Sequence, residues 1–278
     1  MIFLIVICVL VAISLFFAFL FTAFEHYFAL VFYRPFFVHF YFRLKTLSAN
    51  QANVLRREFP YYQTLSARKK RYFEHRVCRF INRYEFVGRD DMIIDDRVRV
   101  LIAAASTMLT FGMRSYLYDV ITTVLVYPYQ YKSPHSEDYH KGEFNPRAKL
   151  IVFSWEDFVS GFADGSDNIN LGIHEFAHVL HFQSLKERDI SAIIFKRMFD
   201  RITREVHHPP NQERLINSDY FRIYAYTNKF EFLAVLIEHF FESPASFKAE
   251  FPEMYNNVSK MLNFHPVLKV PKASFSSR

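Results

Sequence analysis

The sequence is organised around residues 171–182, LGIHEFAHVLHF, which contain His174, Glu175 and His178. Residues four apart lie one above the other on a helix, so the two imidazoles can face one metal ion with Glu175 beside them. A catalytic zinc takes three protein ligands and keeps an open position for water, whose pKa it lowers to about 7. The pattern therefore predicts a zinc hydrolase with Glu175 as general base. The plainer alternative is a buried helix that carries two histidines by chance.

Two histidines leave such a site one ligand short. No histidine follows His178 at the spacing found in metzincins, so a second helix, predicted over 227–243, has to supply the third ligand. Glu231 and Glu238 are seven positions apart and share one face of that helix, and spacing alone does not choose between them. Glu231 lies among apolar residues, where an unpaired carboxylate is costly to bury and a metal would remove that cost.

Other histidines receive no ligand role. His181 lies seven positions after His174, about one turn beyond His178, so we expect it to support the ligands or to face solvent. His135 and His140 lie in the polar stretch 133–146, and we expect both to be exposed.

The N-terminal residues 1–24 contain no charged side chain. An uncharged stretch of this length is sufficient for a helix that crosses a bilayer. A signal peptide has a basic start and a small-residue cleavage site, and this stretch fits neither, so we predict a transmembrane helix over 1–25. Basic residues follow the span, which places the rest of the chain in the cytoplasm. Residues 26–47 are aromatic and basic, and we expect them at the membrane interface, with these side chains at headgroup level: Tyr27, Tyr33 and Tyr41.

Composition limits the remaining possibilities. The 278 residues can hold one domain and an accessory segment, and much of the excess of phenylalanine, 34 in all, lies in the first 45 positions. The net charge is +6, with the densest positive run in 68–83. Such a run could contact an anionic membrane surface or nucleic acid, but we expect a solvated helix face. Two cysteines cannot form a disulfide framework, which favours a reducing compartment.

The pattern of elements favours a predominantly helical α+β domain over 48–265, followed by a tail over 266–278. Helices are predicted over 48–59, 66–83, 95–112, 171–185 and 227–243, and strands over 84–87, 124–127 and 149–154. In many zinc peptidases an edge strand beside the metal helix pairs with an extended peptide, and we assign that place to 149–154. The charged stretch 186–210 ends at Pro209-Pro210, where we predict a loop.

Several motifs occur together and in order over 97–244. They are Arg97–Ala104, Val124–Pro128, Ser154–Asp157, Asn170 with Ile173–His178, Tyr224-Ala225, Thr227-Asn228 and Glu231-Phe232 with Ala234-Val235. With them the sequence resembles the family of bacterial zinc metallopeptidases typified by Mlc titration factor A. His181 departs from the family, in which an Asp is expected, and so does the membrane leader.

The resemblance implies a zincin-like fold related to the catalytic part of anthrax lethal factor. It also implies that His174, His178 and Glu231 bind one zinc ion per chain. Glu175 is then the general base, and Tyr224 lies at the active site.

The leading hypothesis is a membrane-anchored zinc peptidase of the gluzincin type that hydrolyses peptides or proteins. An alternative is a regulatory binding protein that sequesters a transcription regulator, with zinc mainly structural. A structural zinc site is usually closed by four protein ligands and has no need of Glu175, which weighs against that alternative. A third hypothesis is a metal-free helical membrane protein.

Overall fold

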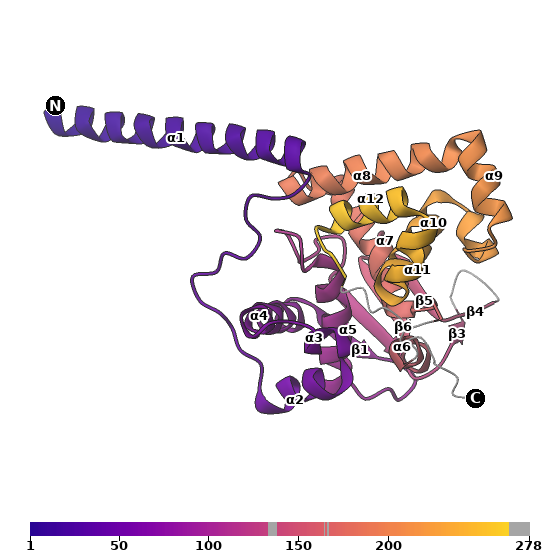
Figure 1. The fold of residues 1–278 in the computed structure, drawn as a ribbon. Helices are drawn as coiled ribbons and strands as arrows, with labels where there is room; N and C mark the ends of the chain where they lie inside the picture. Colours follow the sequence, from indigo (N-terminus) through magenta and orange to yellow (C-terminus); the bar gives the residue numbers. More distant parts are fainter. Residues whose placement is uncertain (133–137, 164, 166, 267–278) are drawn as a thin grey trace, which may run out of the picture.

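The computed structural model describes residues 1–132, 138–163, 165 and 167–266. It shows one predominantly helical α+β domain with a small sheet, from which the long helix α1 (Ile2–Phe32) projects (Figure 1). The predicted fold class is confirmed. Of the predicted C-terminal tail, only residue 266 belongs to the described part of the chain, and His135 also lies outside it.

The main sheet has four strands in the order β1 (Glu85–Gly88), β2 (Thr123–Tyr127), β6 (Leu150–Ser154) and β5 (Gly142–Asn145). The first three are parallel, and β5 pairs antiparallel with β6. Strand β6 therefore lies inside the sheet, and the prediction that 149–154 forms the edge is wrong. The edge is β5, whose sequence GEFN has no apolar run to reveal it. A second, two-stranded sheet pairs β3 (Tyr131–Lys132) with β4 (Tyr139–His140).

Helices make up the rest of the domain. They are α2 (Ala49–Glu58), α3 (Pro60–Gln63), α4 (Ala67–Arg83), α5 (Asp96–Thr110), α6 (Trp155–Ala163), α7 (Leu171–Lys186), α8 (Ile190–His207), α9 (Pro209–Asn217), η1 (Ile223–Tyr226), α10 (Lys229–Glu242), α11 (Pro244–Glu250) and α12 (Pro252–Leu262). All five predicted helices of the domain are present. The loop predicted at Pro209 is wrong, because Pro209 is the first residue of α9, a position whose amide needs no partner.

Helices α7 and α10 carry the motif residues, and an asparagine fixes the start of each. Asn170 Oδ1 accepts a hydrogen bond from the amide of Ile173 at 3.0 Å. Asn228 Oδ1 accepts from the amides of Phe230 and Glu231 at 2.9 and 3.1 Å. Side-chain oxygens at this position satisfy amides that the first helical turn leaves free. Helix α7 packs against α5, α10 and the β5 edge, so it is the central helix of the domain.

Helix α1 continues beyond the predicted span, and its last two turns pack on the domain. The buried Glu25 forms an ion pair with Arg114, Nη1 to Oε2 3.0 Å, and Ala29 is buried as well. Tyr33 caps α1 with a left-handed backbone, φ 51°, and its ring is approached by three cations at 5.0 to 5.7 Å: Arg197, Arg201 and Lys260. The helix is therefore attached to α8 and does not hang from a loose linker (Figure 1).

Length and composition would allow α1 to cross a membrane. Its most apolar 18-residue window has a mean hydropathy of 3.2, and none of that window is buried in the protein. A signal sequence meets the same criterion. The interfacial position of residues 26–47 stays a prediction. Tyr41 also contacts the domain, where its hydroxyl accepts a hydrogen bond from Arg76 Nε at 2.6 Å.

Candidate metal centre

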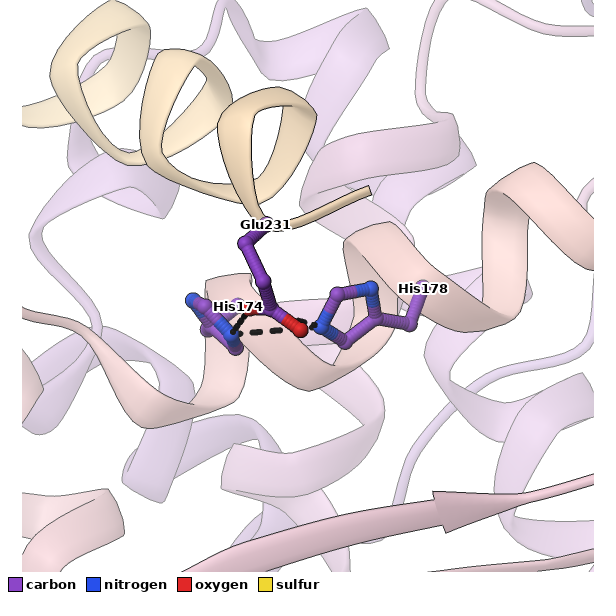
Figure 2. A group of neighbouring side chains, drawn as sticks. All are labelled: His174, His178 and Glu231. Carbon is purple, nitrogen blue, oxygen red and sulfur yellow. Dashed lines mark hydrogen bonds and ion pairs between the residues drawn. The ribbon is translucent and has the colours of Figure 1, made fainter. Parts of the chain in front are cut away.

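Three side chains from α7 and α10 meet at one point (Figure 2). Nε2 of His174 lies 3.2 Å from Nε2 of His178, and the Oε2 atom of Glu231 lies 3.0 and 3.5 Å from these two nitrogens. Glu231 reaches the histidines from the first turn of α10, which packs against α7. The structure thus brings together the three residues expected to bind zinc.

The spacing of these atoms fits a metal ion. Two ligand atoms that each lie about 2.1 Å from a tetrahedral ion are about 3.4 Å apart. The three observed separations, 3.0, 3.2 and 3.5 Å, bracket that value. Two imidazole nitrogens and one carboxylate oxygen are also a donor set that zinc uses in catalytic sites. His174, His178 and Glu231 could therefore hold a metal ion.

Glu238 lies on the other side of His174. Its Oε1 atom is 2.6 Å from Nδ1 of His174, and because a carboxylate only accepts, Nδ1 carries the proton. The guanidinium of Arg222 pairs with both oxygens of Glu238 at 2.6 and 3.0 Å. The spacing in the sequence did not decide between Glu231 and Glu238 as the third ligand, and the structure shows that they lie on different sides of His174. Glu231 faces the point where the three side chains meet, and Glu238 contacts the ring of His174 from the opposite side.

The protonation of His174 and Glu231 shows what the site favours between them. With the proton of His174 on Nδ1, its Nε2 turns a lone pair toward the carboxylate of Glu231 and toward Nε2 of His178. Without a metal, a second proton fills this place. Burial opposes that proton, but the hydrogen bonds to Glu231 and Glu238 outweigh burial and raise the pKa of His174 to about 10. The same contacts overcome burial and hold the pKa of the Glu231 carboxyl well below its usual range.

Glu175 is buried beside the two histidines and faces the edge strand. A Cβ added to Gly142 of β5 would lie 2.9 Å from its Oε1, so the carboxylate fits directly against the strand backbone. Burial raises the pKa of Glu175, and the two histidines oppose this effect. A carboxylate with a raised proton affinity is suited to accept a proton. Glu175 occupies the position that the pattern predicted for a general base.

Tyr224 lies over the site on η1. Its ring centroid is 5.9 Å from that of His174, and about half of the residue, 49%, is exposed. Burial and then the neighbouring carboxylate of Glu231 raise the pKa of Tyr224, so its hydroxyl keeps its proton at neutral pH. It is thus a hydrogen-bond donor at the rim of the site.

His181 is not a ligand in this arrangement. It is buried and packs against Phe199 and Phe230 at 4.7 and 4.9 Å between ring centroids. Burial lowers its pKa to about 4. Of the two positions expected for His181, the solvent-facing one is wrong, because Phe199 of α8 and Phe230 at the start of α10 cover this face of α7.

Sequence reasoning missed Arg222 and Gly142. Neither belongs to a motif, and each reaches the site from a separate segment. Glu238 offers the one signal for Arg222: a carboxylate buried in an apolar helix requires a cationic or hydrogen-bonding partner. The edge position of Gly142 had no comparable signal.

An HExxH helix with a buried glutamate, and a second glutamate that reaches it from a packed helix, are features of metal-dependent peptidases. The sequence matches the family of glucose-regulated metallopeptidases M90 over residues 41–263. The chain belongs to that family. It is also 24% identical over 237 residues to an uncharacterized protein of Synechocystis sp., with 77% of this chain and 84% of the relative covered.

Proposed function

We propose that the protein is a membrane-anchored zinc peptidase that hydrolyses peptide bonds, with its catalytic domain on the cytoplasmic side. The observation that carries the proposal is the convergence of His174, His178 and Glu231 at 3.0 to 3.5 Å with Glu175 buried beside them. The family supports a metallopeptidase, and a metal follows from that class. Zinc is our choice among metals because of the donor set.

We assign a role in hydrolysis to each side chain of the site from its position. Zinc, when bound, supplies a Lewis acid and acidifies a water molecule. His174, His178 and Glu231 hold the ion, and Glu238 fixes the tautomer and orientation of His174. Glu175 takes a proton from the attacking water and passes it to the leaving amine. Tyr224 donates a hydrogen bond to the oxygen that becomes negative in the transition state.

The substrate binds as an extended chain along β5. This strand is the edge of the sheet, and its other side is paired with β6. An edge strand presents backbone donors and acceptors that a peptide can use. Gly142 at its start brings that backbone next to Glu175. A peptide paired with β5 therefore passes the proposed base.

The membrane anchor is α1. Twenty-four uncharged residues are enough to cross the hydrocarbon core of a bilayer, and basic residues follow the span: Arg34, Arg43 and Lys45. Their position favours a cytoplasmic domain.

Glu175→Gln tests the proposal. The substitution keeps the size of the side chain but removes its ability to take a proton. We expect peptide hydrolysis to fall by about a thousandfold or more, while zinc content by elemental analysis stays near one per chain. Glu231→Gln is the contrasting variant, which should lose zinc as well. Unchanged hydrolysis in Glu175→Gln would remove it as base, and capture of a partner protein that is indifferent to Glu175 without any hydrolysis would favour a regulatory binding protein.

A further inference from the structure

Three phenylalanines after α1 face outward. Phe36, Phe40 and Phe42 are 51%, 68% and 93% exposed, and we call them the phenylalanine face. Single exposed apolar residues are common in soluble proteins, but three large rings within seven residues, next to an apolar helix, form a patch that needs a partner.

Two residues of the chain between α1 and α2, His39 and Tyr41, hold this segment against the domain. The ring of His39 stacks on that of Tyr72 at 4.7 Å, and the hydroxyl of Tyr41 is bonded to Arg76. His39 and Tyr41 are thus held against the domain, while the rings beside them, Phe40 and Phe42, stay 68% and 93% exposed.

The end of the segment is held as well. The amide of Lys45 donates to Nδ1 of the buried His75 at 2.8 Å. The segment is therefore bonded to the domain at Tyr41 and at Lys45. The outward direction of the phenylalanines is a property of the fold.

The phenylalanine face continues the surface of α1. Phe36 packs edge-on against Phe24 and Phe28, each at 5.4 Å between ring centroids, and against Phe21 at 6.5 Å. The chain after Tyr33 thus turns back and places the ring of Phe36 against the helix. Phe40 packs on Phe42 at 5.3 Å and on Phe37, the neighbour of Phe36, at 6.2 Å between ring centroids. The exposed side chains of Arg34 and Arg43 flank the face. Aromatic rings between cations match the boundary between acyl chains and anionic headgroups.

We propose that the phenylalanine face enters the lipid interface beside α1 and forms a second contact of the domain with the bilayer. The proposal rests on the membrane span of the proposed function. Continuity with α1 and the flanking cations favour lipid over a second copy of the chain.

Tryptophan fluorescence of the full chain in vesicles tests the proposal. The chain has one tryptophan, Trp155, which Trp155→Phe removes. In that background, Phe40→Trp and Phe42→Trp report on the phenylalanine face, and Phe16→Trp reports on α1. Ile216→Trp is the matched control, because Ile216 is 58% exposed on α9, at the far end of the domain from the start of α1 (Figure 1). The vesicles contain phosphatidylcholine brominated near the glycerol end of its acyl chains.

We expect the emission of Phe40→Trp and Phe42→Trp to shift to shorter wavelength and to be quenched about as strongly as that of Phe16→Trp, with Ile216→Trp unaffected. Quenching of Phe16→Trp alone would overturn the lipid contact and leave the span intact. A shift to shorter wavelength without quenching would also overturn it, since protein would then cover the face. Absence of quenching at Phe16→Trp would instead contradict the anchored function.

Discussion

At the scale of single residues, the two nitrogens of His174 serve different purposes. Nδ1 donates to Glu238, whose charge is balanced by Arg222, and Nε2 faces Glu231 and His178. A histidine that ligates a metal commonly donates its other ring hydrogen to a carboxylate, which fixes the ring and makes it a better ligand. The charge at this site thus depends on Arg222, which directly precedes η1, and on residues of α7 and α10.

Metal binding should release a proton. In the ion-free protein the pKa of His174 is raised to about 10, so zinc has to displace that proton at neutral pH. We expect the apparent zinc affinity to rise about tenfold per pH unit until the pH approaches that pKa. Calorimetric titration in buffers of different protonation enthalpy should count about one proton released per ion. A titration without proton release would contradict the assigned contacts.

The raised pKa of His174 also makes the stability of the ion-free protein depend on pH. This stability falls as the pH rises, whereas the zinc affinity increases. A raised pKa stabilises the fold fully below the ordinary value of 6.5 and loses its effect as the pH rises toward about 10. The ion-free protein should therefore lose thermal stability over that range, while the zinc-bound protein does not.

Glu238→Gln should weaken zinc binding without removing a ligand. The substitution takes away the charge that holds His174 and leaves Arg222 without its carboxylate partner, so we expect zinc affinity to fall about 10- to 100-fold. Glu242→Gln is the matched control. Glu242 lies one turn further along α10, bonds to Asn170, and is mostly protonated at neutral pH because burial raises its pKa to about 8. Equal losses in both variants would argue against a specific role of Glu238.

At the scale of elements, the edge strand β5 positions Glu175. Gly142→Ala would place a Cβ 2.9 Å from Oε1 of Glu175 and 2.7 Å from a methyl carbon of Leu171. The flexible carboxylate is the group that can move away, so we expect turnover to fall about 10- to 100-fold with zinc content unchanged. Kinetic assays and elemental analysis check this. Gly165→Ala, where an added Cβ meets nothing within 4 Å, is the control and should behave as the wild type.

The sequence predicted those elements whose pattern is local. Helix α7 has a capping asparagine, a central apolar run and a basic end, and all three are visible in the sequence. Helix α8 lies in the charged stretch 186–210, for which the sequence predicts no helix, because its buried positions, such as Phe195 and Ile202, are interspersed with charged residues of the solvent face. Strand β5 was missed because its four residues have no hydrophobic alternation and exist as a strand only through pairing with β6.

In the candidate site, too, the residues of a local pattern could be predicted, and those placed by tertiary contacts could not. The two histidines and Glu175 were predicted from spacing on one helix, and family resemblance pointed to Glu231 where spacing left Glu238 open. Arg222 could not be predicted, because its contact with Glu238 depends on how η1 meets α10.

At the scale of the whole molecule, α1 and the domain form one body through the ion pair of Glu25 and Arg114. Glu25→Gln should loosen this junction, because it leaves Arg114 partly buried without its charge partner. We expect hydrogen exchange of the amides from Ala29 to Phe32 to accelerate on the order of tenfold. Mass spectrometry of the chain in lipid nanodiscs measures it. Hydrolysis of a soluble peptide should not change, and unaltered exchange would contradict the role of the ion pair.

The continuous helix α1 has a geometric consequence for the proposed anchored enzyme. A flexible tether would let the catalytic domain sample many heights and directions above the membrane plane, whereas a helix that packs against α8 and pairs with Arg114 restricts that range. The reach of the active site is then set by the shape of the protein itself. Membrane-bound substrates would be selected by how far their cleavable segment stands from the lipid, before any side chain is recognised.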